Sequence, residues 1–103
     1  MTGKKYDGGK LRLDLIPPEA IDALGEVLTY GADKYEPYNW AKGLKFSRVY
    51  GAALRHLNAY WKGEDVDSES GIDHLKHALT NLAFLVSYSE RGMIELDDRY
   101  NQP

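Results

Sequence analysis

Two histidines and an asparagine, His74, His77 and Asn81, are spaced three and four residues apart near the carboxyl-terminal third of the chain. On a helix this spacing puts all three side chains on one stripe. Imidazoles bind phosphate when protonated, coordinate metals when neutral, and transfer protons. The stripe adjoins an apolar line through Leu75 and Leu79, so it is suited to line a site beside a core. Spacing alone leaves a second interpretation open, in which these are half-buried histidines satisfied by their neighbours.

An acidic segment, EDVDSE, occupies residues 64–69. Its oxygen ligands suit Mg²⁺ or Mn²⁺, and Mg²⁺ usually takes one or two carboxylates together with substrate phosphates. Glu26, inside an expected helix and beside core positions, is a further carboxylate of this kind. The sequence therefore predicts metal ligands among Glu26, Glu64, Asp67 and Glu69. The alternative is a solvated loop that favours the following helix through its dipole.

Basic and aromatic groups occur in the two preceding segments. Arg48 and Arg55 are seven residues apart and share a helix face, and their planar forks suit phosphate oxygens. The run KYEPYNW, residues 34–40, offers rings and an amide for a nucleobase, although such rings also plug the ends of helical bundles. The predicted catalytic residues are His74 and His77. The predicted substrate-binding residues are Lys10, Lys34, Tyr35, Asn39, Trp40, Arg48, Arg55, His56 and Asn81.

Three amphipathic helices are expected to position these groups. The first begins at Pro17 or Pro18 and ends near Gly31, the second runs from an amino-terminal cap at Ser47 to Gly63, and the third runs from a capping box at Ser70 to Gly92. Their predicted core lines are Ile21, Leu24 and Leu28; Tyr50, Ala53, Leu54, Leu57 and Trp61; and Ile72, Leu75, Leu79, Leu82 and Val86. We expect a single all-α domain over 1–103, with an extended arm over 1–16 and a fraying tail over 93–103. A weak strand signal is confined to residues 10–16.

Composition limits the alternatives. The chain has 103 residues, no cysteine and a formal charge of −3. Disulfides and cysteine-ligated metals are therefore excluded, and a core of this size benefits from burial between subunits. The mild acidity argues against nucleic acid as a partner, and no apolar run reaches the roughly 18 residues of a membrane span. The expected compartment is the cytoplasm, without a membrane partner.

Four runs carry a combined signature, namely GGKLRLDLIPPEA, EVLTYGADKY, SRVYGAALRH and WKGEDVDSESGIDHLKHALTNLAFL. In this order they resemble the phage-associated dATP/dGTP diphosphohydrolase family over residues 8–92. In the broad sense the similarity extends to the all-α MazG-like nucleotide pyrophosphohydrolases. The resemblance implies hydrolysis of purine deoxynucleoside triphosphates to the monophosphate and pyrophosphate, with Mg²⁺ or Mn²⁺ as cofactor. It also implies a homo-oligomer, of phage or prophage origin, and hence the host cytoplasm.

One departure bears on the metal. MazG-like enzymes hold it with ExxE on one helix and ExxD on the next, but no carboxylate lies between Ser47 and Lys62 here. Gly71 and His74 stand where that clan has its glutamate and aspartate. Either the metal site has moved to the carboxylates named above with help from histidine, or catalysis is lost or different. A non-catalytic purine nucleotide-binding module and a structural phage helical module are the alternatives to hydrolysis.

Overall fold

The computed structural model describes residues 2–100, and within them every regular element is helical. The long helices are α1 (Pro18–Lys34), α2 (Phe46–Trp61) and α3 (His74–Glu90). Three short 3₁₀ helices accompany them: η1 (Leu13–Leu15), η2 (Asn39–Lys42) and η3 (Ile94–Leu96). The predicted all-α class with three main helices is confirmed. Residues 101–103 of the predicted tail lie outside the described residues.

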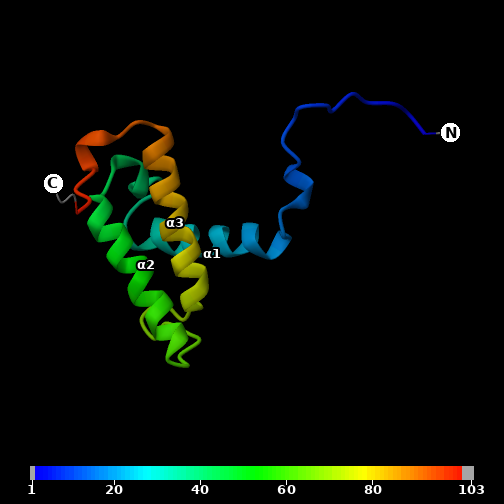
Figure 1. Cartoon of the computed structure of the whole chain (residues 1–103). Coiled ribbons are helices and arrows are strands. Elements are labelled where there is room, and N and C mark those ends of the chain that lie inside the picture. The colour runs from blue at the N-terminus through cyan, green and yellow to red at the C-terminus, as the bar shows by residue number, and fades with distance from the viewer. Residues whose placement is uncertain (1, 101–103) are drawn as a thin grey trace.

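The helices α2 and α3 form an antiparallel hairpin, and the carboxyl-terminal half of α1 packs across α3 (Figure 1). Phe46 stacks on Tyr88 at one end of the hairpin, and His56 stacks on His77 nearer the other. The amino-terminal half of α1 and the arm project away from the hairpin (Figure 1). No described helix is long and apolar enough to cross a membrane.

The buried core lies at the end of the hairpin where α2 begins and α3 finishes. Phe46, Val49 and Tyr88 form its centre, and five half-buried side chains pack around them: Trp40, Phe84, Leu85, Met93 and Leu96. The Tyr88 hydroxyl donates a hydrogen bond to the backbone carbonyl of Trp40 at 2.7 Å. The core therefore draws on η2, both hairpin helices and the segment after α3.

The segment after α3 is docked rather than frayed through residue 98. Gly43 has φ 98°, and a Cβ there would lie 2.6 Å from a Leu96 methyl group, so only glycine admits this contact. The Asp98 carboxylate accepts hydrogen bonds from the Ser47 backbone N–H at 2.8 Å and from the Ser47 hydroxyl. The cap on α2 thus comes from a residue 51 positions later.

Two predicted helix starts are wrong. Ser47 lies inside α2, whose amino-terminal cap position is Lys45, and its backbone N–H donates to Asp98 from a distant segment. Ser70 precedes α3 by four positions, and its hydroxyl donates to Asp67 within the same loop instead of capping the helix. The predicted end of the first helix is also early, since α1 continues past Gly31 to Lys34.

The arm forms no strand among the described residues, and its one regular turn is η1. The predicted strand signal at 10–16 is therefore wrong. Leu11, Leu13 and Leu15 are 65–85% exposed, so the rest of the described chain covers little of them.

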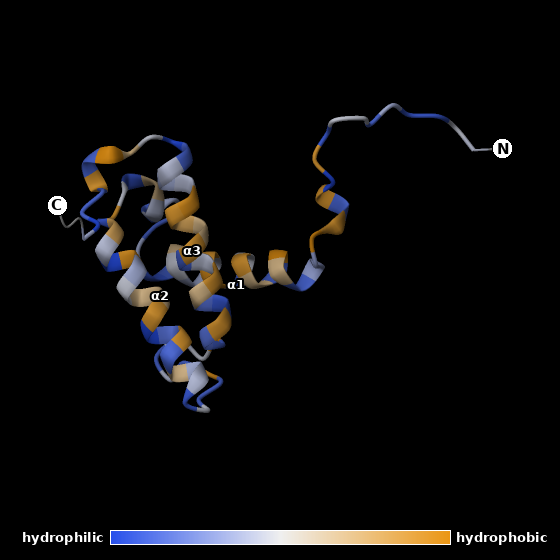
Figure 2. Cartoon of the chain, in the orientation of Figure 1, coloured by the Kyte–Doolittle hydropathy of each residue, from blue (hydrophilic) through white to orange (hydrophobic). Residues whose placement is uncertain are grey.

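The predicted core lines are only partly buried. Ala53 and Ile72 are buried, whereas most of the larger apolar side chains remain open to solvent: Ile21, Leu28, Tyr50, Leu54, Leu57, Trp61, Leu75, Leu79, Leu82 and Val86. Hydrophobic segments recur along the hairpin and along the projecting part of α1 (Figure 2). The predicted core lines are thus largely exposed within one chain, whereas small residues such as Ala53 and Ala78 are buried.

Candidate active site

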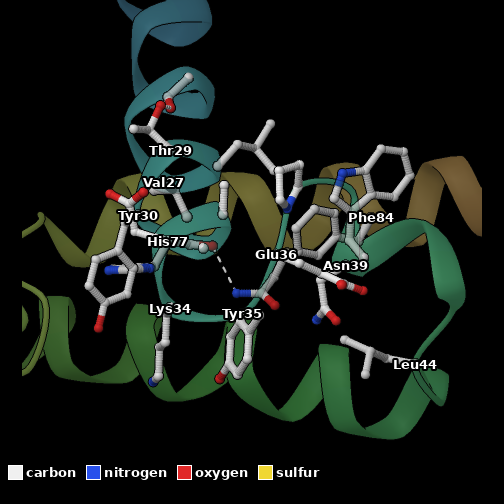
Figure 3. A pocket seen from close by; sticks show the side chains of 18 of the residues that line it. Val27, Thr29, Tyr30, Lys34, Tyr35, Glu36, Asn39, Leu44, His77 and Phe84 are labelled. Carbon is white, nitrogen blue, oxygen red and sulfur yellow. Dashed lines mark hydrogen bonds between the residues drawn. The ribbon is translucent and has the colours of Figure 1, made fainter.

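A pocket of about 980 Å³ lies between the end of α1, the segment that follows it, and one face of the α2–α3 hairpin (Figure 3). This volume is at the upper end of the range for small-molecule sites. Side chains enter it from five segments: α1, residues 35–40, α2, the loop before α3, and α3 itself. It is the place where the polar groups of the sequence converge.

Eleven of the fifteen predicted site residues line this pocket: Lys34, Tyr35, Asn39, Trp40, Arg55, His56, Asp67, Glu69, His74, His77 and Asn81. Four do not: Lys10, Glu26, Arg48 and Glu64. Lys10 belongs to the exposed arm. Glu26 pairs with Lys76 on the flank of α3 at 2.8 Å, and Arg48 is exposed near the start of α2. Glu64 contacts a pocket histidine from outside.

The aromatic end of the pocket combines a fixed ring with exposed rings. The Trp40 indole stacks on Phe84, with ring centroids 5.7 Å apart, and the Arg91 guanidinium lies 4.8 Å from its centroid. Trp40 is therefore a packing residue of the core edge. Tyr35 and Tyr38 are 63% and 75% exposed, and Figure 3 shows Tyr35 pointing the same way as Lys34. These two rings remain free to stack on a planar ligand.

Cationic groups stand beside these rings. The Lys34 ammonium lies 2.8 Å from a Glu69 carboxylate oxygen and within 6 Å of the Tyr30 and Tyr35 ring centroids. The hydrogen bond to Glu69, followed by the contact with Tyr35, raises the pKa of Lys34. Arg55 reaches the pocket from α2. The site therefore holds two permanent positive charges next to its aromatic side.

Three imidazoles form the inner end of the pocket. His56 and His74 approach with their Nδ1 atoms 2.8 Å apart, and the His56 ring stacks on His77 with centroids 4.5 Å apart. Tyr30 meets His77 edge-on (Figure 3). Burial lowers the pKa of both His56 and His77, and the neighbouring imidazoles add to the effect. A lowered pKa favours the neutral form of these two rings, the form that acts as a base or a ligand.

The predicted metal carboxylates each have a separate partner. Asp67 accepts a hydrogen bond from the Ser70 hydroxyl at 2.8 Å. Burial raises the pKa of Asp67, but the hydrogen bonds from Ser70 and the nearby His77 have the larger combined effect, so the pKa is lowered. Glu64 contacts His74, and Glu69 contacts Lys34. Within residues 2–100 no three histidine or carboxylate side chains are arranged to hold an ion. Of these predicted ligands only Asp67 and Glu69 line the pocket, beside the carboxylates of Asp33 and Glu36. Two carboxylates plus phosphate oxygens are a set that Mg²⁺ accepts.

Two residues that contribute to the site were missed from the sequence. Ser70 links Asp67 to His77, with its hydroxyl oxygen 2.7 Å from His77 Nε2. Tyr30 packs on the same imidazole from α1. The position of Ser70 ahead of a helix suggested a cap, and no spacing rule joins Tyr30 to a histidine 47 residues later. The sequence indicated only that His77 lies on a polar stripe of its helix, and it did not indicate that Ser70 or Tyr30 would contact it.

Comparison with known proteins agrees with this arrangement of groups. Residues 1–99 match the model for the amino-terminal region of the dATP/dGTP diphosphohydrolase family. A curated dATP/dGTP diphosphohydrolase of Salmonella phage PMBT28 is 41% identical over 85 residues, which are 82% of this chain and 29% of that protein. The chain thus spans less than a third of the length of this relative. No solved structure matches. The match over nearly the whole chain shows that it belongs to the dATP/dGTP diphosphohydrolase family.

Proposed function

We propose that this chain hydrolyses purine deoxynucleoside triphosphates, dATP or dGTP, to the monophosphate and pyrophosphate. One observation carries the proposal: a single pocket unites exposed aromatic rings, the cations Lys34 and Arg55, four carboxylates and imidazoles. Few ligands other than a nucleotide need all four kinds of group at once. The name of the phage relative supports the choice of purine substrates. The absence of a membrane-spanning helix in the described residues is compatible with work in the host cytoplasm.

In the proposed complex the base stacks on Tyr35 or Tyr38, and the Asn39 amide hydrogen-bonds its edge. Lys34 and Arg55 neutralise the triphosphate, which carries several negative charges near these donors. Asp67 and Glu69 would hold a divalent cation, Mg²⁺ or Mn²⁺. When bound, it would polarise the phosphate. Glu69 would then no longer pair with Lys34, whose ammonium would be available to phosphate.

The direct test is release of pyrophosphate and monophosphate from dATP and dGTP, with Mg²⁺ and with Mn²⁺, by the purified chain. Turnover that disappears on chelation supports the proposal. Glu69→Gln is expected to raise the metal concentration needed for half-maximal rate at least tenfold, with Glu90→Gln as the matched exposed control outside the pocket. Binding of dATP without any product would instead support a non-catalytic nucleotide-binding module and overturn hydrolysis.

We further propose that the working form is a homodimer joined through the exposed side of the hairpin. The apolar stripes of α2 and α3 contain Leu54 and Leu79 and lie opposite the positions that contact α1 and the pocket, because a helix advances about 100° per residue. No charged residue occurs in α3 between His77 and Glu90. Together with its exposed leucines, this makes the outer face of α3 an apolar patch of the kind that a partner covers. A second copy supplies the same apolar face and completes a four-helix bundle.

Surface and shape favour this second copy. The chain exposes 8276 Å², whereas a compact monomer of its mass exposes about 5,900 Å². Its radius of gyration is 16.8 Å against about 13 Å for a compact domain of this length. The excess of about 2,400 Å² per chain falls within the area that obligate dimers bury. The arm accounts for part of this excess, because its leucines are exposed.

A further inference from the structure

The three histidines differ in which ring nitrogen is free, and this difference assigns their roles. His56 and His74 share a hydrogen bond between their Nδ1 atoms at 2.8 Å. In such a bond one nitrogen carries the hydrogen and the other accepts it. Which of the two nitrogens donates follows from the contact that His74 makes through its other ring nitrogen, Nε2.

The far side of His74 is a carboxylate. His74 Nε2 lies 3.1 Å from Glu64 Oε1, and an ionised carboxylate can only accept. His74 Nε2 therefore carries the hydrogen, and in the neutral ring its Nδ1 must accept from His56. Both nitrogens of His74 are then engaged, and the residue is 5% exposed. No atom of this side chain remains to act on a substrate.

The same argument leaves one nitrogen of His56 unengaged. With its hydrogen on Nδ1, neutral His56 presents the lone pair of Nε2, and its side chain lines the pocket. A chain of two hydrogen bonds thus runs from Glu64 through His74 to His56. It fixes the tautomer of His56 in the way that a carboxylate orients a catalytic histidine.

His77 reaches a carboxylate by a different route. The Ser70 hydroxyl has a single hydrogen, which Asp67 receives at 2.8 Å, so His77 Nε2 donates to the Ser70 oxygen at 2.7 Å. A neutral hydroxyl stands between this imidazole and the carboxylate, and the direct separation is 3.7 Å. Moreover, two imidazolium rings stacked with centroids 4.5 Å apart would repel each other. Only one of the pair can take up a proton, and His56 is the one joined to a carboxylate through imidazole alone.

We infer that His56 is the general base of the proposed hydrolysis and that Glu64 and His74 are its positioning residues. His56 Nε2 takes a proton from the water whose oxygen forms a bond to the α-phosphorus. The bond from that phosphorus to the bridging oxygen breaks, and its electron pair leaves with pyrophosphate. The imidazolium passes its proton to solvent afterwards. This inference rests on the proposed function, and it moves the catalytic role from His74 to His56.

The tautomers can be measured without substrate. Nitrogen-15 NMR of the histidine rings in the intact chain at pH 7.5 is expected to show hydrogen on Nδ1 of His56 and on Nε2 of His74. Glu64→Gln replaces a group that can only accept by an amide that can also donate, and it removes the negative charge, so it is expected to change the His74 and His56 nitrogen shifts, whereas Glu90→Gln leaves them unchanged. The opposite tautomers in the wild-type chain would overturn the inference whatever the activity.

Kinetics test the role itself. His56→Gln is expected to lower kcat about 100-fold or more with KM and nucleotide affinity within threefold, because a general base contributes on this scale. Added imidazole is expected to restore part of the rate of His56→Gly. Glu64→Gln is expected to lower kcat about tenfold at unchanged KM. An active wild type with His56→Gln within threefold of its kcat would overturn the inference alone, and an inactive wild type would overturn both proposals.

Discussion

The α2–α3 hairpin has two faces of opposite character. On the face toward α1, histidines, a serine and carboxylates hold one another, and in residues 2–100 no buried side-chain nitrogen or oxygen lacks a hydrogen-bond partner. On the other face, Leu54, Leu57, Leu79 and Leu82 are each 37–46% exposed and contact nothing that could shield them fully. The polar face is satisfied within the described residues, whereas the apolar face is the one that we propose a second copy covers. Assembly and chemistry should therefore be separable by mutation.

The largest expected effect is on the apolar face. Leu79→Asp puts two charges into the proposed dimer interface, and burying an unpaired carboxylate in apolar surroundings is costly. We expect the dimer dissociation constant to rise at least about 100-fold, measured by sedimentation equilibrium. Ser68→Asp, in the exposed loop, adds the same charge and should leave association unchanged. Equal sedimentation of all three proteins as monomers would remove the proposed interface.

The aromatic end of the pocket allows a second test, because its two rings have different surroundings. Trp40→Ala removes a ring stacked on Phe84 and is expected to destabilise the fold by about 3 kcal/mol in chemical denaturation. Tyr35→Ala removes an exposed ring and should leave stability unchanged but weaken dATP binding about tenfold by calorimetry. Equal loss of binding in a folded Trp40→Ala would instead make the indole a base platform.

Two arginines on α2 provide a matched pair. Arg55 lines the pocket and Arg48 does not, although their spacing suggested one shared face. Arg55→Ala is expected to raise KM for dATP about tenfold through the lost phosphate contact. Arg48→Ala removes the same charge outside the pocket and should change KM less than twofold. Comparable increases in KM for both variants would contradict the conclusion that Arg55 contacts the substrate and Arg48 does not.

The smallest expected effect is a dependence of stability on pH. Burial, and then His77 and His74, lower the pKa of folded His56, with Arg55 acting in the same direction and Asp67 opposing. The unfolded chain therefore binds more protons between about pH 6.5 and that lower value, so stability falls as pH drops through this window. We expect the Tm to decrease by a few degrees from pH 7.5 to 5.5. The decrease should be smaller in His56→Asn, and an identical decrease would assign it to other groups.

Much of the candidate site could be predicted because it follows from residue type and helical period. His74, His77 and Asn81 share a stripe by spacing alone, and the 34–40 segment was recognised from its rings and its lysine. The pocket joins these groups as expected. The choice among carboxylates could not be predicted, because Glu26 and Glu64 differ from Asp67 only in the partners that folding gives them.

The roles of the histidines could not be read from the chain either. Whether His56 or His74 presents a free nitrogen depends on Glu64, which lies on a third segment, and on the 2.8 Å contact between two helices. A hydrogen-bond chain is a property of atoms from distant positions, and spacing within one helix does not contain it.

The amino-acid sequence by itself determined the helical class, the approximate extent of three helices, the family and the inventory of chemical groups, because periodicity and composition are local properties. The tertiary structure decided which stripe of each helix faces inward. Ala53 and Ala78 are buried, whereas large leucines of the same two helices, such as Leu54 and Leu79, remain exposed. The spacing of apolar residues predicts which helix face is hydrophobic, but only the tertiary structure shows whether the same chain buries that face.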